Sequence, residues 1–144
     1  MKYVSTRGEA PTLNFDDALL SGLARDGGLY VPQTWPSMSA ADIAALKGLS
    51  YSETAFRVMR PFKGDAISDD DFARLIEDAY AGFDDPAVAP MKKLGDNEWL
   101  MELFHGPTLA FKDYAMQFLG PMFDYVLKKR GKRVTIVGAT SGDT

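Results

Sequence analysis

Apolar residues are spaced most regularly in residues 108–130, and this spacing predicts one long helix. Once residue 112 is counted, the apolar stripe of the helix consists of Leu109, Met116, Leu119, Phe123 and Val126. The polar face opposite consists of Asp113, Gln117, Asp124 and Lys128. Lys112 therefore stands where an apolar side chain is expected. Lysine is almost never buried unless it is paired or has a chemical role, so Lys112 is the first candidate functional residue.

The position of Lys112 has two interpretations. Burial disfavours the charged ammonium and favours the neutral, nucleophilic amine. A lysine needs that form to make a Schiff base with a carbonyl compound. Alternatively, the aliphatic stem lies on apolar surface while the amine stays in water. The spacing alone favours this second interpretation.

Capping residues and apolar spacing predict the other elements. Helices are expected from Asn14 to about residue 22, from Ser39 to about 46, from Ser50 to about 60, and from Ser68 onward. Short strands are expected at residues 2–5 and 29–32, the second ended by a proline. The acidic residues 69–71 suit the first turn of the helix after Ser68.

Strands are also predicted on both sides of the long helix, at residues 98–104 and 133–138. A strand, a helical crossover and a second strand form the βαβ unit of a parallel sheet. Pro86 and Pro90 mark a connection before this unit. We therefore expect an α/β protein, with a small α+β domain over residues 1–85 and the start of a parallel-sheet domain over residues 86–144. A parallel sheet needs more strands than these, so we expect the N-terminal part of a longer protein, truncated at Thr144.

Composition narrows the class of protein. The 144 residues are 46% hydrophobic and 25% charged, as in globular proteins. A net charge of −4 argues against nucleic acid as the main partner. No apolar run approaches the roughly 18 residues that suggest a membrane span. The absence of cysteine and the single histidine, His105, argue against disulfides and against a metal site rich in these residues. We expect a cytoplasmic protein that binds neither nucleic acid nor membrane.

Three segments are candidates for chemistry. Residues 105–113, His-Gly-Pro-Thr-Leu-Ala-Phe-Lys-Asp, lead from a strand end into a helix, where sites in α/β sheets gather. Residues 138–144, Gly-Ala-Thr-Ser-Gly-Asp-Thr, offer small and hydroxyl residues whose backbone amides could bind an anion, or could form a plain capped turn. Residues 26–32, Asp-Gly-Gly-Leu-Tyr-Val-Pro, and residues 5–8, Ser-Thr-Arg-Gly, look like structural turns when taken alone.

Taken together and in this order, the segments resemble the threonine synthases, which are fold-type II pyridoxal-phosphate enzymes. The resemblance runs along essentially the whole chain, and residues 105–113 carry it most specifically. It implies that Lys112 is the catalytic lysine and binds pyridoxal 5'-phosphate as a Schiff base, with Phe111 beside the cofactor. It also implies that Ser141, Gly142, Asp143 and Thr144 bind the substrate. The glycine-rich loop for the cofactor phosphate is expected beyond residue 144.

The activity that the resemblance implies is the conversion of O-phospho-L-homoserine and water to L-threonine and phosphate. In this reaction of threonine biosynthesis, Lys112 would move protons at Cα and Cβ of the substrate. Another fold-type II lyase, such as a threonine deaminase, is the alternative enzyme, and residues 26–32 favour threonine synthase over it. A non-catalytic fragment or interaction module is the remaining alternative, because residues 1–144 alone are not expected to catalyse the reaction.

Overall fold

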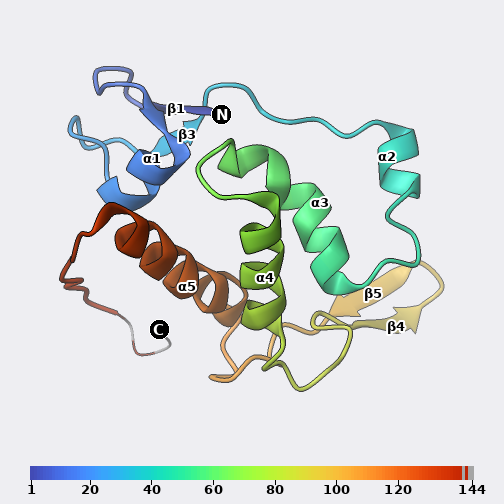
Figure 1. Cartoon of the computed structure of the whole chain (residues 1–144). Helices are drawn as coiled ribbons and strands as arrows, with labels where there is room; N and C mark the ends of the chain where they lie inside the picture. Colours follow the sequence, from blue (N-terminus) through green and yellow to red (C-terminus); the bar gives the residue numbers. More distant parts are fainter. Residues whose placement is uncertain (141, 143–144) are drawn as a thin grey trace. The chain divides into compact units, whose positions relative to one another are not determined.

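The computed structural model describes residues 1–140 and 142, and the chain divides into two units, Met1–Ala73 and Arg74–Thr144. In the first unit, β1 (Lys2–Ser5) is the central strand of a three-stranded antiparallel sheet (Figure 1). Its neighbours are β2 (Leu13–Asn14) and β3 (Tyr30–Pro32), and Tyr3 lies opposite both Leu13 and Pro32. The strands predicted at residues 2–5 and 29–32 are therefore confirmed, while the two-residue β2 was not predicted.

The helices of the first unit begin where the capping residues predict. They are α1 (Phe15–Ser21), α2 (Ala40–Ala44) and α3 (Tyr51–Lys63), followed by α4 (Asp69–Tyr80), which continues into the second unit. Ser39 and Ser50 each form a complete capping box, with Asp42 and Glu53 respectively. Helix α3 runs past its predicted end at residue 60 and includes Pro61. A proline removes one backbone donor, but its fixed φ is compatible with the helix.

The core of the first unit is aromatic and aliphatic. Phe72 and Ile67 are 2% and 1% exposed, and the ring of Phe72 lies 6.1 Å from that of Phe56. Tyr3 is also buried and donates its hydroxyl to the carbonyl oxygen of Phe62 at 2.7 Å. Burial raises the pKa of the Tyr3 phenol. This hydrogen bond ties the central strand to the end of α3.

The strands of the second unit form an antiparallel hairpin, and the described residues do not show the predicted parallel sheet. Strand β4 (Met91–Gly95) pairs with β5 (Glu98–Met101), and Lys93 lies opposite Trp99. The predicted strand at residues 98–104 is therefore shorter, and its neighbour precedes it in the chain. Residues 133–138 form no strand, and Ile136 and Val137 are 78% and 91% exposed. A strand exists through its inter-strand hydrogen bonds, and the described residues supply none for this segment.

Helix α5 (Asp113–Arg130) starts later than predicted, and of the predicted apolar stripe it buries Val126. Phe118, Met122 and Val126 are its buried apolar residues, whereas Met116 is 45% exposed. The end is as predicted, with Gly131 in the left-handed conformation after three basic residues, Lys128, Lys129 and Arg130. Residues 108–112 lie outside the helix, so the predicted apolar stripe does not extend to them.

Aromatic packing stabilises the second unit. The ring of Phe83 lies 4.9 Å from that of Tyr114 and 5.5 Å from that of Tyr80. The hydroxyl of Tyr80 donates to the carbonyl oxygen of Tyr114 at 3.0 Å, and the hydroxyl of Tyr114 donates to that of Val88. These contacts fix the first turns of α5, next to the segment that carries Lys112. Over residues 1–140 and 142, no helix combines the length and the apolar character needed to cross a membrane.

Candidate active site

Two successive turns carry the candidate lysine, and we call residues 106–112 the lysine loop. The backbone N–H of Leu109 donates to the carbonyl oxygen of Gly106 at 3.0 Å, and that of Asp113 donates to Ala110 at 3.0 Å. Leu109 has a φ of 64°, a conformation that non-glycine residues rarely adopt. The side chain of Leu109 is 66% exposed. The lysine loop is therefore a defined, locally strained turn structure and not the first turn of a helix.

Lys112 and Phe111 lie together at the end of this loop. The ammonium nitrogen of Lys112 is 5.9 Å from the centre of the Phe111 ring. Lys112 is half-buried and Phe111 is 60% exposed. Lys112 is also the N-cap residue of α5, and its carbonyl oxygen accepts the N–H groups of Ala115 and Met116 at 3.1 and 2.9 Å. The backbone of Lys112 is thus fixed at the start of a helix, while its side chain is only half-buried.

Asp113 was predicted on the solvated face of the helix, and this prediction is wrong. Asp113 is 3% exposed and accepts the backbone N–H of Thr108 at 2.8 Å and the Thr108 hydroxyl at 2.9 Å. The side-chain amide of Gln117 donates to it at 3.3 Å. Burial acts to raise the pKa of Asp113, but the hydrogen bonds from Thr108 and Gln117 outweigh burial and hold that pKa below its usual value. Apolar spacing could not reveal this, because the partner Thr108 precedes the helix.

His105 pairs with a residue that the sequence analysis did not single out. Its Nε2 lies 3.0 Å from Oε2 of Glu102, and Lys92 lies 3.4 Å from the other carboxylate oxygen. The hydrogen bond from His105, followed by that from Lys92, lowers the pKa of Glu102. An ionised carboxylate only accepts hydrogen bonds, so Nε2 of His105 is the donor. These contacts give His105 a structural role beside β5.

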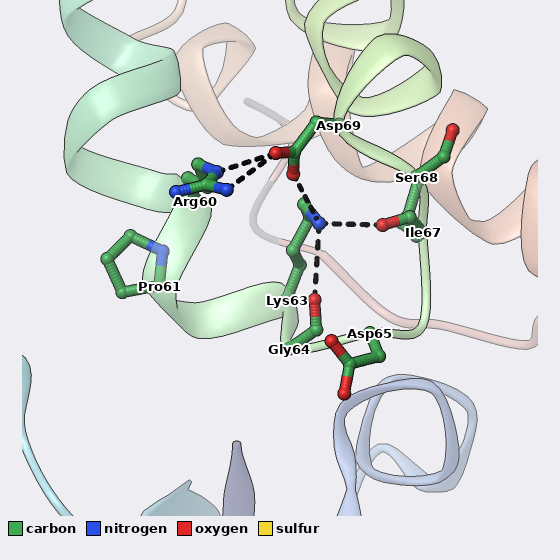
Figure 2. A pocket seen from close by; sticks show the side chains of 8 residues that line it. All are labelled: Arg60, Pro61, Lys63, Gly64, Asp65, Ile67, Ser68 and Asp69. Atoms are coloured by element: carbon green, nitrogen blue, oxygen red, sulfur yellow. Dashed lines mark hydrogen bonds and ion pairs between the residues drawn. The ribbon is translucent and has the colours of Figure 1, made fainter.

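The deeply buried lysine of this chain is Lys63, at the end of α3 (Figure 2). Lys63 is 5% exposed, and its ammonium donates to the carbonyl oxygens of Ile67 and Gly64 at 2.7 and 3.1 Å and lies 2.9 Å from Asp69. Hydrogen bonds from Arg60 and Lys63 lower the pKa of Asp69 to about 2. These acceptors match the three donors of an ammonium. Lys63 therefore joins α3 to α4 structurally, and the donors of its ammonium are engaged by these three partners.

Hydrogen bonds to the Asp26 carboxylate join the two N-terminal motifs, residues 5–8 and 26–32. This carboxylate accepts the hydroxyl of Ser5 at 2.7 Å and the backbone N–H groups of Gly28, Glu9 and Ala10 at 3.0, 3.0 and 2.9 Å. The hydrogen bond from Ser5 is the main reason that the pKa of Asp26 is lowered. Gly28 has no room for a Cβ, because the Ser5 hydroxyl lies against it. The interpretation of residues 5–8 and 26–32 as structural turns thus agrees with the geometry.

Of the predicted substrate residues, Gly142 lies within the described part of the chain. It has a φ of 110°, and its N–H donates to the hydroxyl of Thr140 at 3.2 Å. Ser141, Asp143 and Thr144 lie outside the described residues. Substrate binding by residues 141–144 therefore stays a prediction.

Comparison with known proteins adds an independent line of evidence. The sequence model described as threonine synthase N terminus matches residues 2–80. The chain belongs to the threonine synthase family. It is 60% identical over 144 residues to the threonine synthase of Pseudomonas aeruginosa, covering all of this chain and 31% of that protein. This chain thus spans about a third of the length of its threonine synthase relatives.

Solved structures agree with the family. A pyridoxal-phosphate-bound threonine synthase from Brucella melitensis matches with a TM-score of 0.96 and 61% identity, over 99% of this chain and 31% of that one. Yeast threonine synthase matches with a TM-score of 0.83 and 40% identity, over 90% of this chain and 27% of that one. The mixed α/β structure of this chain is therefore that of the corresponding part of threonine synthases.

Proposed function

We propose that this chain is the N-terminal part of a pyridoxal-phosphate-dependent threonine synthase, a lyase that makes L-threonine and phosphate from O-phospho-L-homoserine and water. The likeness to a pyridoxal-phosphate-bound threonine synthase over 99% of the chain carries the proposal. Residues 1–85 would form the N-terminal domain and residues 86–144 the start of the cofactor-binding domain. The extended segment 133–138 would then pair with strands that follow it in a parallel sheet. We place the enzyme in the cytoplasm.

The residues of the lysine loop fit an aldehyde cofactor with an aromatic ring. Such a cofactor needs a primary amine that it can reach, and Lys112 is half-buried whereas Lys63 is 5% exposed with its donors in use. The ring of Phe111, 5.9 Å from the Lys112 ammonium, offers a flat apolar surface beside that amine. Lys112 would hold the cofactor covalently, and Phe111 would pack beside it. When bound, pyridoxal phosphate supplies an electron sink for charge that develops at Cα of the substrate.

Residues of this chain would have three further roles in the reaction: proton transfer, exclusion of water and binding of the substrate. The Lys112 amine would accept and return protons at Cα and Cβ, as a general base and acid. Phe111 would exclude water from the reacting face, which strengthens electrostatic interactions there. The hydroxyls and backbone amides of Ser141, Gly142, Asp143 and Thr144 would bind an oxyanion of the substrate, its carboxylate or its phosphate. The chain spans about a third of the length of its relatives. We therefore expect residues 1–144 alone to be catalytically inactive.

Reductive trapping tests this proposal in the full-length protein. Borohydride should fix pyridoxal phosphate to Lys112, as identified by peptide mass mapping, and the protein should absorb visible light before reduction. Lys112→Ala should abolish the trapping, whereas Lys92→Ala, a surface lysine of the same unit, should leave it unchanged. Label on Lys92 or Lys93 would show that the site is wrong, and a full-length protein without bound cofactor would refute the enzyme assignment. Turnover of phosphohomoserine by residues 1–144 alone would contradict the expected inactivity.

A further inference from the structure

Asp113 places a buried carboxylate directly behind the lysine loop. An aspartate at the start of a helix usually accepts hydrogen bonds from N–H groups of that helix. Asp113 instead reaches back to the preceding loop, where both the N–H and the hydroxyl of Thr108 donate to it. It is 3% exposed, although it belongs to one of the residue types that are rarely buried. A buried carboxylate that accepts two hydrogen bonds from a loop restrains the position of that loop.

Neighbouring backbone is shaped around the same carboxylate. A Cβ on Gly106 would lie 2.5 Å from both Cβ and Oδ2 of Asp113, so only glycine fits there. Between these two contacts, Leu109 is held at a φ of 64°. Strained conformations of this kind persist when the surroundings determine them, and they gather at functional sites. Gly106, Thr108 and Asp113 together therefore define the course of the lysine loop.

We propose that Asp113 is a positioning residue for Lys112, acting through Thr108. This inference rests on the proposed function, because it assigns a role relative to the cofactor-binding lysine. Thr108 is bound at both its N–H and its hydroxyl, which restrains the loop on one side of Lys112, and α5 restrains it on the other. The amine then starts from one backbone position and one direction. A lysine that must both hold a cofactor and move protons needs that precision.

The chemistry of the acceptor decides which substitution of Asp113 removes these contacts. An ionised carboxylate only accepts, and its two oxygens can take the donors of Thr108 and Gln117 together. An asparagine of the same shape has one accepting oxygen and two unwanted donors. Because the Thr108 hydroxyl can turn to accept from such an amide, an asparagine can keep both contacts with Thr108. Asp113→Leu has a similar branched shape but no acceptor, so it removes both hydrogen bonds. Thr108→Val removes the hydroxyl alone and keeps the backbone N–H, and Thr108→Ser keeps both donors.

The test is trapping of the cofactor in the full-length protein at one equivalent of pyridoxal phosphate. We expect the borohydride label on Lys112, expressed per folded protein, to fall about tenfold to a hundredfold in Asp113→Leu and in Thr108→Val. Thr108→Ser should retain it, and so should the matched control Asp124→Leu, which changes an exposed aspartate of the same helix. Circular dichroism measures the folded fraction, so a purely structural loss is separated from a loss of trapping. Thr108→Val carries the test if Asp113→Leu does not fold.

The outcomes separate this inference from the proposed function. Normal labelling of Lys112 in folded Asp113→Leu or Thr108→Val overturns the positioning role and leaves the enzyme assignment intact. An equal loss in Thr108→Ser also overturns it, because that variant keeps both hydrogen bonds. A full-length wild-type protein that takes no label at Lys112 overturns both proposals together.

Discussion

Replacing Lys63 by methionine tests whether the buried lysine is a structural clamp. Methionine keeps the long unbranched stem but has no donor for the carbonyl oxygens of Ile67 and Gly64. Asp69 is not left alone, because Arg60 stays 2.6 Å from it and its side chain is 43% exposed. The main cost is the buried carbonyl of Ile67, which loses a charged donor at 2.7 Å. Such an unsatisfied group costs about 1–3 kcal/mol.

Relief of the desolvated ammonium offsets part of this cost. We therefore expect Lys63→Met to lower the free energy of unfolding by about 2 kcal/mol. For a chain of this size, that corresponds to a melting temperature roughly 4–8 °C lower. Urea titration followed by circular dichroism measures the free energy, and an unchanged m-value shows that the unfolded state is comparable.

The matched control is Lys128→Met, which removes another lysine from an ion pair. Lys128 and Asp124 lie 2.6 Å apart, but their side chains are 77% and 62% exposed. Exposed pairs at this helical spacing contribute roughly 0.3–0.5 kcal/mol. If Lys63→Met costs no more than this control, the buried contacts of Figure 2 do not stabilise the first unit as argued.

Further predictions follow from the same geometry. The pKa of Asp69 is lowered from 3.8 to about 2, so its contribution to stability is complete above pH 3.8 and is lost as the pH falls toward 2. The stability difference between wild type and Asp69→Asn should therefore shrink across that window in acid titrations, and a difference that is independent of pH would contradict the ion pairs. Gly106→Ala should cost about 1–3 kcal/mol in urea unfolding, because its methyl group would lie 2.5 Å from the Asp113 side chain. The control Gly120→Ala, with nothing within 4 Å in α5, should stabilise by up to about 1 kcal/mol, and equal effects of the two changes would refute the close contact.

Local signals in the sequence were sufficient for the starts of α1, α2, α3 and α4 and for the end of α5. The capping boxes at Ser39 and Ser50 are closed by side chains three residues away, so both partners are visible in the sequence. Gly131 likewise ends α5 through its own backbone conformation. The motif of residues 105–113 carried the resemblance to threonine synthases, which the comparisons confirm.

Pairings between residues far apart in the chain leave no local signal in the sequence. Strand β4 lacks the alternation of a half-buried strand, and it forms because β5 lies beside it. Conversely, residues 133–138 have the composition of a strand but gain no strand neighbour among the described residues. The contact between Asp26 and Ser5 spans 21 positions in the chain, so neither residue predicts the other.

The two lysines show most clearly what only the tertiary structure decided. By itself the sequence determined the family, the starts of the first four helices and Lys112 as the candidate residue, because these depend on motifs and on near neighbours. It left open whether the Lys112 amine is buried or stays in water, and the structure buries Lys63 and leaves Lys112 half-buried at the end of a turn. Burial depends on which carbonyl and carboxylate groups fold around an ammonium, and apolar spacing does not contain that information. The same holds for Asp113, whose buried carboxylate is explained only by Thr108 folding back onto it.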